Sequence, residues 1–389
     1  MRRRAGRAMF IFWLGMLGLG CQTLGTAGVA LSRVDVRRLP EGAIQPQAAV
    51  DSKGYVHLIY YEGAGDAGNL YYLRKAPGQT VYFGPIRVNS VPDSAGAIGT
   101  VRTAQLAIGK DDRVHVVWNG LGPKGPDGNP IAFQAYTRLN DAGTAFEPQR
   151  KLTTWAYGID GGGSVAADKD GDVYVTWHAI ATANDEAGAA VFIAVSHDNG
   201  KTFAREKQVN PDHTGACGCC GMRALADSKG VLYILYRAAG DKIHRDTMLL
   251  VSRDKGQTFT EKRLDPWSIS TCPMSTYSLS EGNDGILAAW ETREQITYAT
   301  LHPTDPISAK PFPASGTTQK HPVLVSNARG QSLFVWTEGT GWQRGGDLVW
   351  RVFDKDGTLL ESGRKENGIP VWGLATAYAR PDGGFVIIY

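Results

Sequence analysis

Three of the five cysteines of this chain are crowded into the stretch CGCCGMR, residues 217–223, and Cys272 follows in TCPMSTYSL. Thiols at this density form disulfides or bind a soft metal ion. In the disulfide interpretation, one of Cys217, Cys219 and Cys220 bridges to Cys272 and the other two pair locally. A bond between the neighbours Cys219 and Cys220 would be strained and easily reduced.

In the metal interpretation, the thiolates bind copper or zinc together with Met274, Met222 or His213 as further ligands. The spacing CxCC is not a standard zinc signature. Export from the cytoplasm favours disulfides, because extracytoplasmic compartments are oxidising. Both interpretations need all four cysteines close together in space. Whether they come together depends on how the fold arranges the segments that contain them.

A pattern of two apolar strands around a tight turn recurs along the chain. The first strand ends in a turn of Asp, Lys and Gly, and the second ends in an aromatic residue. We count seven copies, at 48–63, 105–120, 164–179, 223–238, 277–292, 322–339 and 376–389. Gly, Asn and Asp tolerate positive φ in hairpin turns, and Val, Ile, Tyr and Trp suit half-buried strands. The spacing of roughly 45–60 residues is typical of propeller blades.

The copies predict an all-β fold, a β-propeller of four-stranded antiparallel blades, with seven blades by the count of copies. Most copies are followed by a second, weaker hairpin that supplies the outer strands. The last copy ends at Tyr389 without such a hairpin, and VDVRRLP at 34–40 can supply an outer strand there. That strand would close the ring and leave no open edge. We therefore expect a single domain over 34–389.

The topology of such a blade predicts where the cysteines meet. The turns within each hairpin share one face of the propeller, and the segments that enter the first strands share the other. The CGCC stretch enters the first strand of the fourth copy, and Cys272 enters that of the fifth. Adjacent blades should therefore bring all four cysteines together near the mouth of the central channel, where propellers usually bind ligands.

Two of the outer hairpins share a motif that carries a family resemblance. The matched residues are Ser196, Asp198, Gly200, Thr202 and Phe203 in the first hairpin, and Ser252, Asp254, Gly256, Thr258 and Phe259 in the second. The motif resembles the Asp-box, or BNR repeat, of sialidase-like β-propellers. It is a structural device: the Asp accepts backbone N–H bonds, the Gly allows the bend and the Phe packs between blades. The resemblance favours six blades, which stays open beside the seven counted.

The cysteine segment adds a second resemblance. Cys217, Cys219, Cys220 and Arg223, with Cys272-Pro273 one blade later, resemble a bacterial exported subgroup of sialidase-like proteins with a CxCC-Arg motif. Those proteins often carry His after Cys-Pro, where this chain has Met274. The resemblance implies a shared site without naming its ligand.

Sialidase chemistry implies three arginines that clamp a carboxylate, a Tyr nucleophile activated by a Glu, and an Asp acid/base. The predicted channel face offers Tyr277 with Glu291 as the nucleophile pair and Asp160 as the acid. The candidate ligand-binding residues there are Arg102, Arg223, Arg245 and His321. The Arg-Ile-Pro motif of sialidases is replaced at the matching stretch by Ile44-Gln45-Pro46, so the first clamp arginine has no match.

The N-terminus predicts export. The basic run MRRRAGR precedes the apolar run AMFIFWLGMLGL and then Cys21, which predicts a lipoprotein-type signal peptide at 1–20, lipidation at Cys21 and a linker at 21–33. The alternative is plain secretion with cleavage near Gly28-Val29-Ala30. Removing four arginines with the signal lowers the formal charge from +3 to about −1, which gives no electrostatic reason for nucleic-acid binding.

These features lead to three functional hypotheses for a protein of the bacterial cell envelope. The first is a lipid-anchored, sialidase-like propeller, monomeric, that binds a glycan or small anionic ligand at the channel mouth and can include exo-sialidase-type glycoside hydrolysis. The second is a non-catalytic binding or scaffold propeller. The third is a metal- or redox-handling propeller with copper or zinc on the cysteine cluster.

Overall fold

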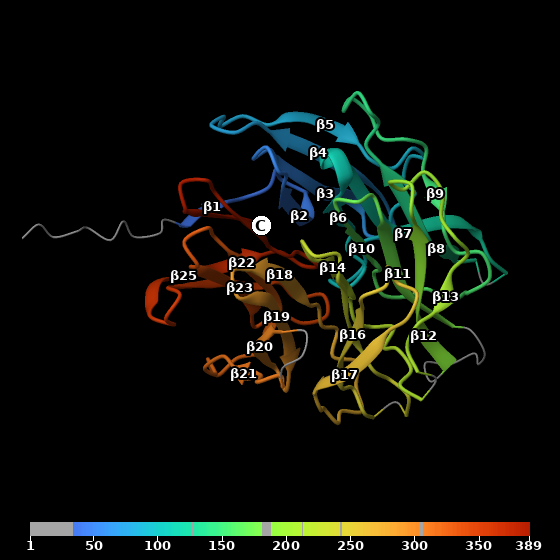
Figure 1. Ribbon diagram of the computed structural model, residues 1–389. Coiled ribbons are helices and arrows are strands. Elements are labelled where there is room, and N and C mark those ends of the chain that lie inside the picture. The colour runs from blue at the N-terminus through green and yellow to red at the C-terminus, as the bar shows by residue number, and fades with distance from the viewer. Residues whose placement is uncertain (1–33, 127, 181–187, 212, 242, 303–305) are drawn as a thin grey trace, which may run out of the picture. The chain divides into compact units, whose positions relative to one another are not determined.

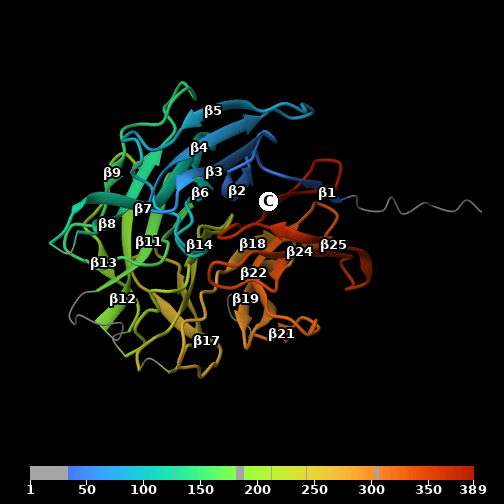
Figure 2. The same cartoon turned by 180° about the vertical axis from the view of Figure 1, so that it is seen from behind.

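The computed structural model describes residues 34–389 apart from 127, 181–187, 212, 242 and 303–305. The expected signal peptide, the lipidation site Cys21 and the linker at 21–33 lie outside the described residues. Within the described part, the chain forms seven sheets arranged around a common centre, as the opposite views in Figures 1 and 2 show. No helix in that part is both long enough and apolar enough to cross a lipid bilayer.

Six sheets are four-stranded and antiparallel, and each follows the chain from the centre outward. Blade 1 contains β2 (Ile44–Val50), β3 (Val56–Ala64), β4 (Ala67–Lys75) and β5 (Phe83–Arg87). Blade 2 contains β6 (Gln105–Ile108), β7 (Val114–Lys124), β8 (Pro130–Arg138) and β9 (Arg150–Lys151), with the short 3-10 helix η1 (Lys110–Asp112) in its first turn. Blade 3 contains β10 (Ser164–Ala167), β11 (Val173–Ile180), β12 (Ala189–Ser196) and β13 (Lys207–Gln208).

The second half of the ring repeats this plan. Blade 4 contains β14 (Arg223–Ala226), β15 (Leu232–Arg237), β16 (Thr247–Ser252) and β17 (Thr260–Asp265). Blade 5 contains β18 (Ser278–Gly282), β19 (Gly285–Thr292), β20 (Gln295–Leu301) and β21 (Lys310–Pro311). Blade 6 contains β22 (Gln319–Ser326), β23 (Ser332–Glu338), β24 (Gly346–Phe353) and β25 (Leu359–Ile369).

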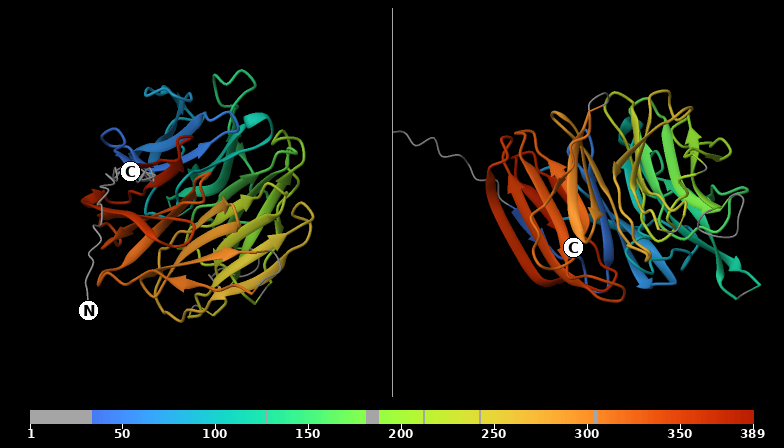
Figure 3. Two further views of the ribbon diagram at one scale, coloured as in Figure 1. Left: turned by 60° about the vertical axis from the view of Figure 1, so that its left-hand side comes forward. Right: turned by 90° about the horizontal axis from the view of Figure 1, so that it is seen from below.

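The seventh blade closes the ring with strands from both ends of the propeller. It has three strands, β26 (Thr376–Ala379), β27 (Phe385–Ile388) and β1 (Val34–Arg37). The segment expected to supply the closing strand does so, although β1 runs parallel to β27. Figure 3 shows the red C-terminal strands beside the blue strands of blade 1, where β26 packs on β2. The count of seven blades from the repeats is therefore confirmed over six.

The middle strands are buried because each blade packs a neighbour on both of its faces. The aromatic residues that end the second strands in the repeats lie between blades, and Trp118, Trp177 and Trp290 are each at most 1% exposed. One apolar cluster joins Tyr233 and Leu235 of blade 4 to Leu279 of blade 5. Strands with no solvent-facing side need no polar alternation, so the sequence of these strands is almost continuously apolar.

The first turns of blades 1, 4 and 6 repeat one hydrogen-bond pattern. The carboxylate of Asp227 accepts bonds from the backbone N–H groups of Lys229 and Val231, at 2.9 and 2.8 Å. Asp51 accepts the equivalent bonds in blade 1, and the amide oxygen of Asn327 accepts them in blade 6. The residue type that begins each turn is thus set by the need to satisfy the turn's own N–H groups.

The two turns that resemble Asp-boxes also make matching bonds. In the first, the Ser196 hydroxyl donates to Asp198 and accepts from the Gly200 N–H, while Asp198 accepts from the Thr202 N–H at 2.8 Å. The equivalent residues of the second turn, Ser252 to Thr258, repeat these bonds. Phe203 packs edge-on against Tyr136 of the preceding blade, with ring centroids 4.7 Å apart. These residues hold turns and blades together, as expected.

Candidate functional site

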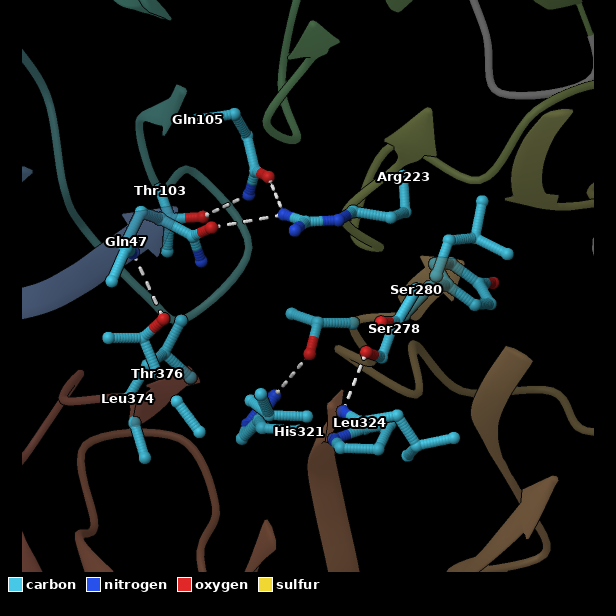
Figure 4. Close-up of a pocket in the computed structure, with 18 of the residues that line it drawn as sticks. Gln47, Thr103, Gln105, Arg223, Ser278, Ser280, His321, Leu324, Leu374 and Thr376 are labelled. Carbon is cyan, nitrogen blue, oxygen red and sulfur yellow. Dashed lines mark hydrogen bonds between the residues drawn. The ribbon is translucent and has the colours of Figure 1, made fainter. Parts of the chain in front are cut away.

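The central channel contains a cavity of about 310 Å³ lined by the inner strands. This volume lies at the lower end of the range of small-molecule sites, about 300–1,000 Å³. Most of the polar groups in it come from residues near the start of the inner strands, and the side chains labelled in Figure 4 converge on the same space. The polar residues that line the cavity near the start of the inner strands are Gln47, Thr103, Gln105, Arg223, Thr276, Ser278, His321 and Thr376.

One repeat position supplies a ring of side chains around this channel. It lies four residues before the start of each first turn and is occupied by Gln47, Gln105, Ser164, Arg223, Ser278, Val323 and Thr376. In three blades its hydroxyl accepts a backbone N–H bond from the inner strand of the next blade. These bonds run to Ser164 from Ala224, to Ser278 from Leu324, and to Thr376 from Ala48. The hydroxyls therefore join neighbouring blades, and the larger side chains are left to face the cavity.

Arg223 reaches across the channel from blade 4 to blades 1 and 2. Its Nη1 donates to the side-chain oxygen of Gln47 at 3.0 Å and to that of Gln105. Gln105 is held in turn by a 3.1 Å bond from its Nε2 to the Thr103 hydroxyl. Both partners are neutral amides, and Figure 4 shows one end of the guanidinium pointing toward both of them.

The charge of Arg223 has no carboxylate partner among the described residues. Burial lowers the pKa of this guanidinium to about 10, and no neighbouring charge opposes that shift. Its hydrogen bonds to Gln47 and Gln105 both use Nη1, which leaves the N–H groups of Nε and Nη2 for another acceptor. Those two nitrogens form the edge of a guanidinium that binds a carboxylate through two parallel hydrogen bonds. The cavity thus contains the cationic group of an anion-binding site, and the anion would have to come from a ligand.

His321 provides a neutral polar group opposite Arg223. It lies on β22 at a bulge, and its Nδ1 is 3.2 Å from the Thr276 hydroxyl. Burial, together with the charge of the neighbouring Lys320, lowers the pKa of His321 to about 3. The imidazole is therefore uncharged at neutral pH and adds hydrogen-bonding capacity without adding charge.

Two tryptophans stand beside His321 at a smaller hollow. Trp342 and Trp372 have ring centroids 6.1 Å apart, and Trp342 is 52% exposed. They share the hollow with Met274, Lys320 and His321, so it adjoins the main cavity through His321. Exposed aromatic faces beside a polar cavity offer a surface on which an apolar ligand face can pack.

The four cysteines of the cluster come together as the blade topology predicts. A disulfide joins Cys219 to Cys272 and so connects the segments that enter β14 and β18. Cys217 and Cys220 carry thiols whose sulfur atoms are 3.6 Å apart, and the sulfur of Cys217 is 4.0 Å from that of Cys219. The predicted bridge from the clustered cysteines to Cys272 is therefore present and involves Cys219, whereas the other two, which were expected to pair locally, are thiols.

A buried group of charges lies next to the thiols. Arg237 is 1% exposed, stacks over Trp267 and donates to the backbone oxygens of Arg245 and Glu291 at 2.7 and 2.6 Å. Burial raises the pKa of Glu291, although the Lys320 ammonium 3.7 Å away acts against that shift. Glu291 also accepts a hydrogen bond from the Ser275 hydroxyl.

The three arginines expected to clamp a carboxylate do not share the cavity. Arg102 is bound to the side chain and backbone oxygen of Asp160 and to the backbone oxygen of Ile98. Arg245 is buried in the segment between β15 and β16 and does not line the cavity. Arg223 and His321 do line it, so half of the expected ligand-binding set faces the cavity.

The side chains of the expected nucleophile pair, Tyr277 and Glu291, have different contact partners and do not face each other. The ring of Tyr277 packs in the core between blades 4 and 5, 5.7 Å from the Arg237 guanidinium. Burial raises the pKa of Tyr277. Glu291 contacts Ser275 and Lys320, and Asp160 is paired with Arg102. Catalytic roles for Tyr277, Glu291 and Asp160 stay predictions.

The further metal ligands named from the sequence lie in separate places. Met274 lies in the tryptophan hollow, and His213 lines a surface hollow with Asp241 and His244. No group of three or more His, Cys, Asp or Glu side chains in the described part of the chain is arranged to hold a metal ion. Copper or zinc binding to the cysteine cluster stays a prediction.

Several residues of the site were missed in the sequence. They are Gln47, Gln105, Thr103 and Thr276 in the cavity, Trp342 and Trp372 at the hollow, and Lys320 near the cysteine cluster. A signal for Gln47 and Gln105 was present, because they occupy the same repeat position as Arg223. Aligning the seven copies on their turns would have identified that ring.

Comparison with known proteins supports the fold. No protein-family model and no curated protein matches this sequence. An α-L-arabinanase of Penicillium chrysogenum, solved with arabinobiose, superposes with a TM-score of 0.53 at 12% identity, over 82% of this chain and 96% of that one. The NanB sialidase of Streptococcus pneumoniae superposes with a TM-score of 0.52 at 9% identity, over 77% of this chain and 66% of that one. This chain thus spans slightly less than two thirds of the NanB chain, and the likeness to both structures supports the β-propeller fold.

Proposed function

We propose that this protein is a binding propeller that holds a small acidic sugar, or a glycan ending in one, in its central channel. The observation that carries the proposal is the guanidinium of Arg223, which faces the cavity without a carboxylate partner in the described structure. A buried cation is costly unless it is paired, so a carboxylate from a ligand would supply the missing partner.

The other groups around the cavity match the rest of such a ligand. Thr276, Ser278 and neutral His321 offer hydrogen bonds suited to sugar hydroxyls. Trp342 and Trp372 offer aromatic faces on which the C–H face of a sugar ring can pack. Propellers of related fold include an arabinanase solved with a sugar ligand, which makes a carbohydrate a reasonable class to test first.

Glycoside hydrolysis is the second candidate function, and the sialidase-like fold is the observation that favours it. It would need Tyr277, Glu291 or Asp160 to approach a substrate in the cavity, whereas each of them is engaged elsewhere. A screen of fluorogenic sialosides, glucuronides and arabinosides separates the two candidates. Turnover that Tyr277→Phe abolishes would favour the hydrolase.

The binding experiment uses calorimetry with N-acetylneuraminate, glucuronate and galacturonate, and with glucose as the uncharged counterpart. We expect at least one acid to bind and glucose not to bind. Arg223→Gln should weaken that binding by about 10- to 150-fold, since hydrogen bonds to charged groups contribute about 1.5–3 kcal/mol. Arg223→Lys should lose less, because it keeps the charge and loses only the paired geometry.

The matched control is Arg37→Gln, which removes a surface arginine whose partner is Asp35 at 2.7 Å. This variant should bind the acid as the wild type does. Equal affinity of the wild type and Arg223→Gln for every acid would overturn the proposal. Export, lipid attachment through Cys21, a place in the cell envelope and a monomeric state are further proposals that come from the sequence, and fractionation of expressing cells with mass analysis of the N-terminus tests the first three.

A further inference from the structure

Two buried thiols lie directly behind a solvent-accessible disulfide. Cys217 and Cys220 are 4% and 3% exposed, Cys219 is half-buried, and Cys272 is exposed. A bridge that only holds blades 4 and 5 together needs Cys219 and Cys272 alone. It does not account for two further sulfur atoms in contact with each other and near that bridge.

The sulfur positions form a chain from the interior to the surface. The sulfur of Cys220 is 3.6 Å from that of Cys217, which is 4.0 Å from that of Cys219, which is bonded to Cys272. Thiol–disulfide exchange proceeds when a thiolate attacks a neighbouring disulfide sulfur. The two non-bonded sulfur–sulfur distances in this chain, 3.6 and 4.0 Å, place each thiol next to the sulfur that it would attack.

We propose that Cys217, Cys219, Cys220 and Cys272 form a thiol–disulfide exchange site, in which one disulfide moves between Cys219–Cys272 and Cys217–Cys220. The exchange makes Cys272 a surface thiol that reacts with an external disulfide. This inference does not depend on the proposed sugar binding.

The internal exchange balances without an added oxidant. The Cys217 thiolate attacks the Cys219 sulfur, so the Cys217–Cys219 bond forms and Cys272 leaves as a thiolate that takes up a proton. The Cys220 thiolate then attacks the Cys217 sulfur, so Cys217–Cys220 forms and Cys219 leaves as a thiolate that also takes up a proton. One disulfide and two thiols are present before and after.

The external step uses a disulfide compound as the oxidant. The Cys272 thiolate attacks that compound, forms a mixed disulfide and releases the first thiol. Cys219 then attacks the Cys272 sulfur, restores Cys219–Cys272 and releases the second thiol. The protein ends with two disulfides, and the external disulfide is reduced to two thiols.

The surroundings of Cys220 favour its thiolate. Burial acts to raise the pKa of Cys220, but a hydrogen bond with Cys217, the charge of Arg237 and a backbone bond from Ser275 together lower it to about 7. The Cys217 S–H group donates to the Cys220 sulfur at 3.6 Å, so the Cys220 thiolate can accept the Cys217 proton and leave Cys217 as the first attacking thiolate. Arg237 is fixed by two backbone oxygens and by Trp267, so its charge is held in place beside the thiols.

The test traps the surface thiol in the full-length protein, purified without reductant. The native protein is incubated with light N-ethylmaleimide, then denatured, reduced and treated with heavy N-ethylmaleimide, and peptides are read by mass spectrometry. We expect the light label to accumulate on Cys272, while Cys217 and Cys220 carry the heavy label. Light label on Cys217 and Cys220 with heavy label on Cys272 would overturn the proposal.

Two serine variants give a matched pair. Cys217→Ser removes the attacking group, so light labelling of Cys272 should slow at least 10-fold. Cys220→Ser leaves the first attack intact, so Cys272 should still be labelled, with Cys217 and Cys219 bonded to each other. Equal labelling of Cys272 in both variants would contradict the proposed order. The wild-type result stands alone if either variant fails to fold.

The external partner is identified by adding glutathione disulfide or a protein with scrambled disulfides to the wild type. Reduction of the first indicates a small disulfide, and rearrangement of the second indicates a protein. Reaction with neither would overturn the external step. Stoichiometric binding of copper or zinc that protects Cys217 and Cys220 from label would instead make the cluster a metal site.

Discussion

Blade 4 contains a buried arginine, Arg237, and a half-buried one, Arg223, with opposite electrostatic surroundings. Arg237, at the end of β15, is bound by two backbone oxygens and two aromatic faces. Arg223, at the start of β14, donates hydrogen bonds to two neutral side-chain amides and lines the cavity. Burial acts against both charges, yet the negative neighbours of Arg237, including Cys220 and Glu291, raise its pKa, while nothing offsets the lowered pKa of Arg223. Burial of a charge therefore suggests ligand binding only where the partners are missing.

The largest expected effect separates the two arginines by stability. Arg237→Met should lower the free energy of unfolding by about 2–6 kcal/mol, because it leaves the buried backbone oxygens of Arg245 and Glu291 without their hydrogen-bond donor, at about 1–3 kcal/mol each. Arg223→Met should change it by no more than about 1 kcal/mol, or raise it, because it removes a desolvated charge that has no ion-pair partner. Urea unfolding followed by tryptophan fluorescence measures both. Equal losses would mean that Arg223 is also a structural residue.

The same contrast explains what the sequence could predict. Repeated features were visible: the seven copies, the closing strand at 34–40 and the meeting of Cys219 with Cys272 all follow from blade topology. The direction of single side chains was not. Thr276, Tyr277 and Ser278 all border the cavity, yet the ring of Tyr277 packs into the core between blades 4 and 5.

Long side chains were harder still, because their partners lie on distant blades. Arg223 meets Gln47 and Gln105 across the channel, and no local pattern specifies that reach. Arg102 has a type suited to a carboxylate clamp, but it meets the chain's own Asp160 instead. Residue type identifies candidates, and only the partners decide which charge is left for a ligand.

A second, smaller effect compares two histidines through pH. Burial lowers the pKa of both His115 and His321 to about 3, against about 6.5 in an unfolded chain. Between these values the unfolded state binds the extra proton, so stability falls as the pH falls below 6.5. Each histidine should cost about 2 kcal/mol at pH 5 relative to neutral pH. Urea unfolding at pH 7 and pH 5 should show a smaller acid loss for His321→Gln.

The cavity makes these two histidines distinguishable. A bound acid beside His321 would stabilise its protonated form and reduce the acid loss in the wild type. The Nδ1 atom of His115 lies 2.7 Å from the Tyr136 hydroxyl, and His115 does not line the cavity. The part of the acid destabilisation that comes from His115 should therefore not respond to the ligand. If the ligand does not change the loss of unfolding free energy between pH 7 and pH 5, the bound anion lies away from His321.

The smallest expected effect is a loss of unfolding free energy from a change in one of the repeated turns, which have equivalents in several blades, whereas the cavity has none. Asp198 accepts bonds from the Ser196 and Thr202 hydroxyls and the Thr202 N–H, and the pKa of its carboxyl is lowered to about 2. Its contribution is complete above pH 4 and is lost as the pH falls towards 2. Asp198→Asn should lower the unfolding free energy by about 1 kcal/mol at pH 7, as loss of a capping carboxylate does, and leave acid binding unchanged.

Asp254 accepts the same set of bonds one blade later, so Asp254→Asn should act in the same direction and add to the first variant. Substitutions at equivalent turn positions are thus interchangeable, because each turn satisfies its own groups. Substitutions at the ring position of Gln47, Gln105 and Arg223 should not be interchangeable, because those side chains satisfy one another across the channel. A change in acid affinity in either turn variant would show that turns and cavity are coupled.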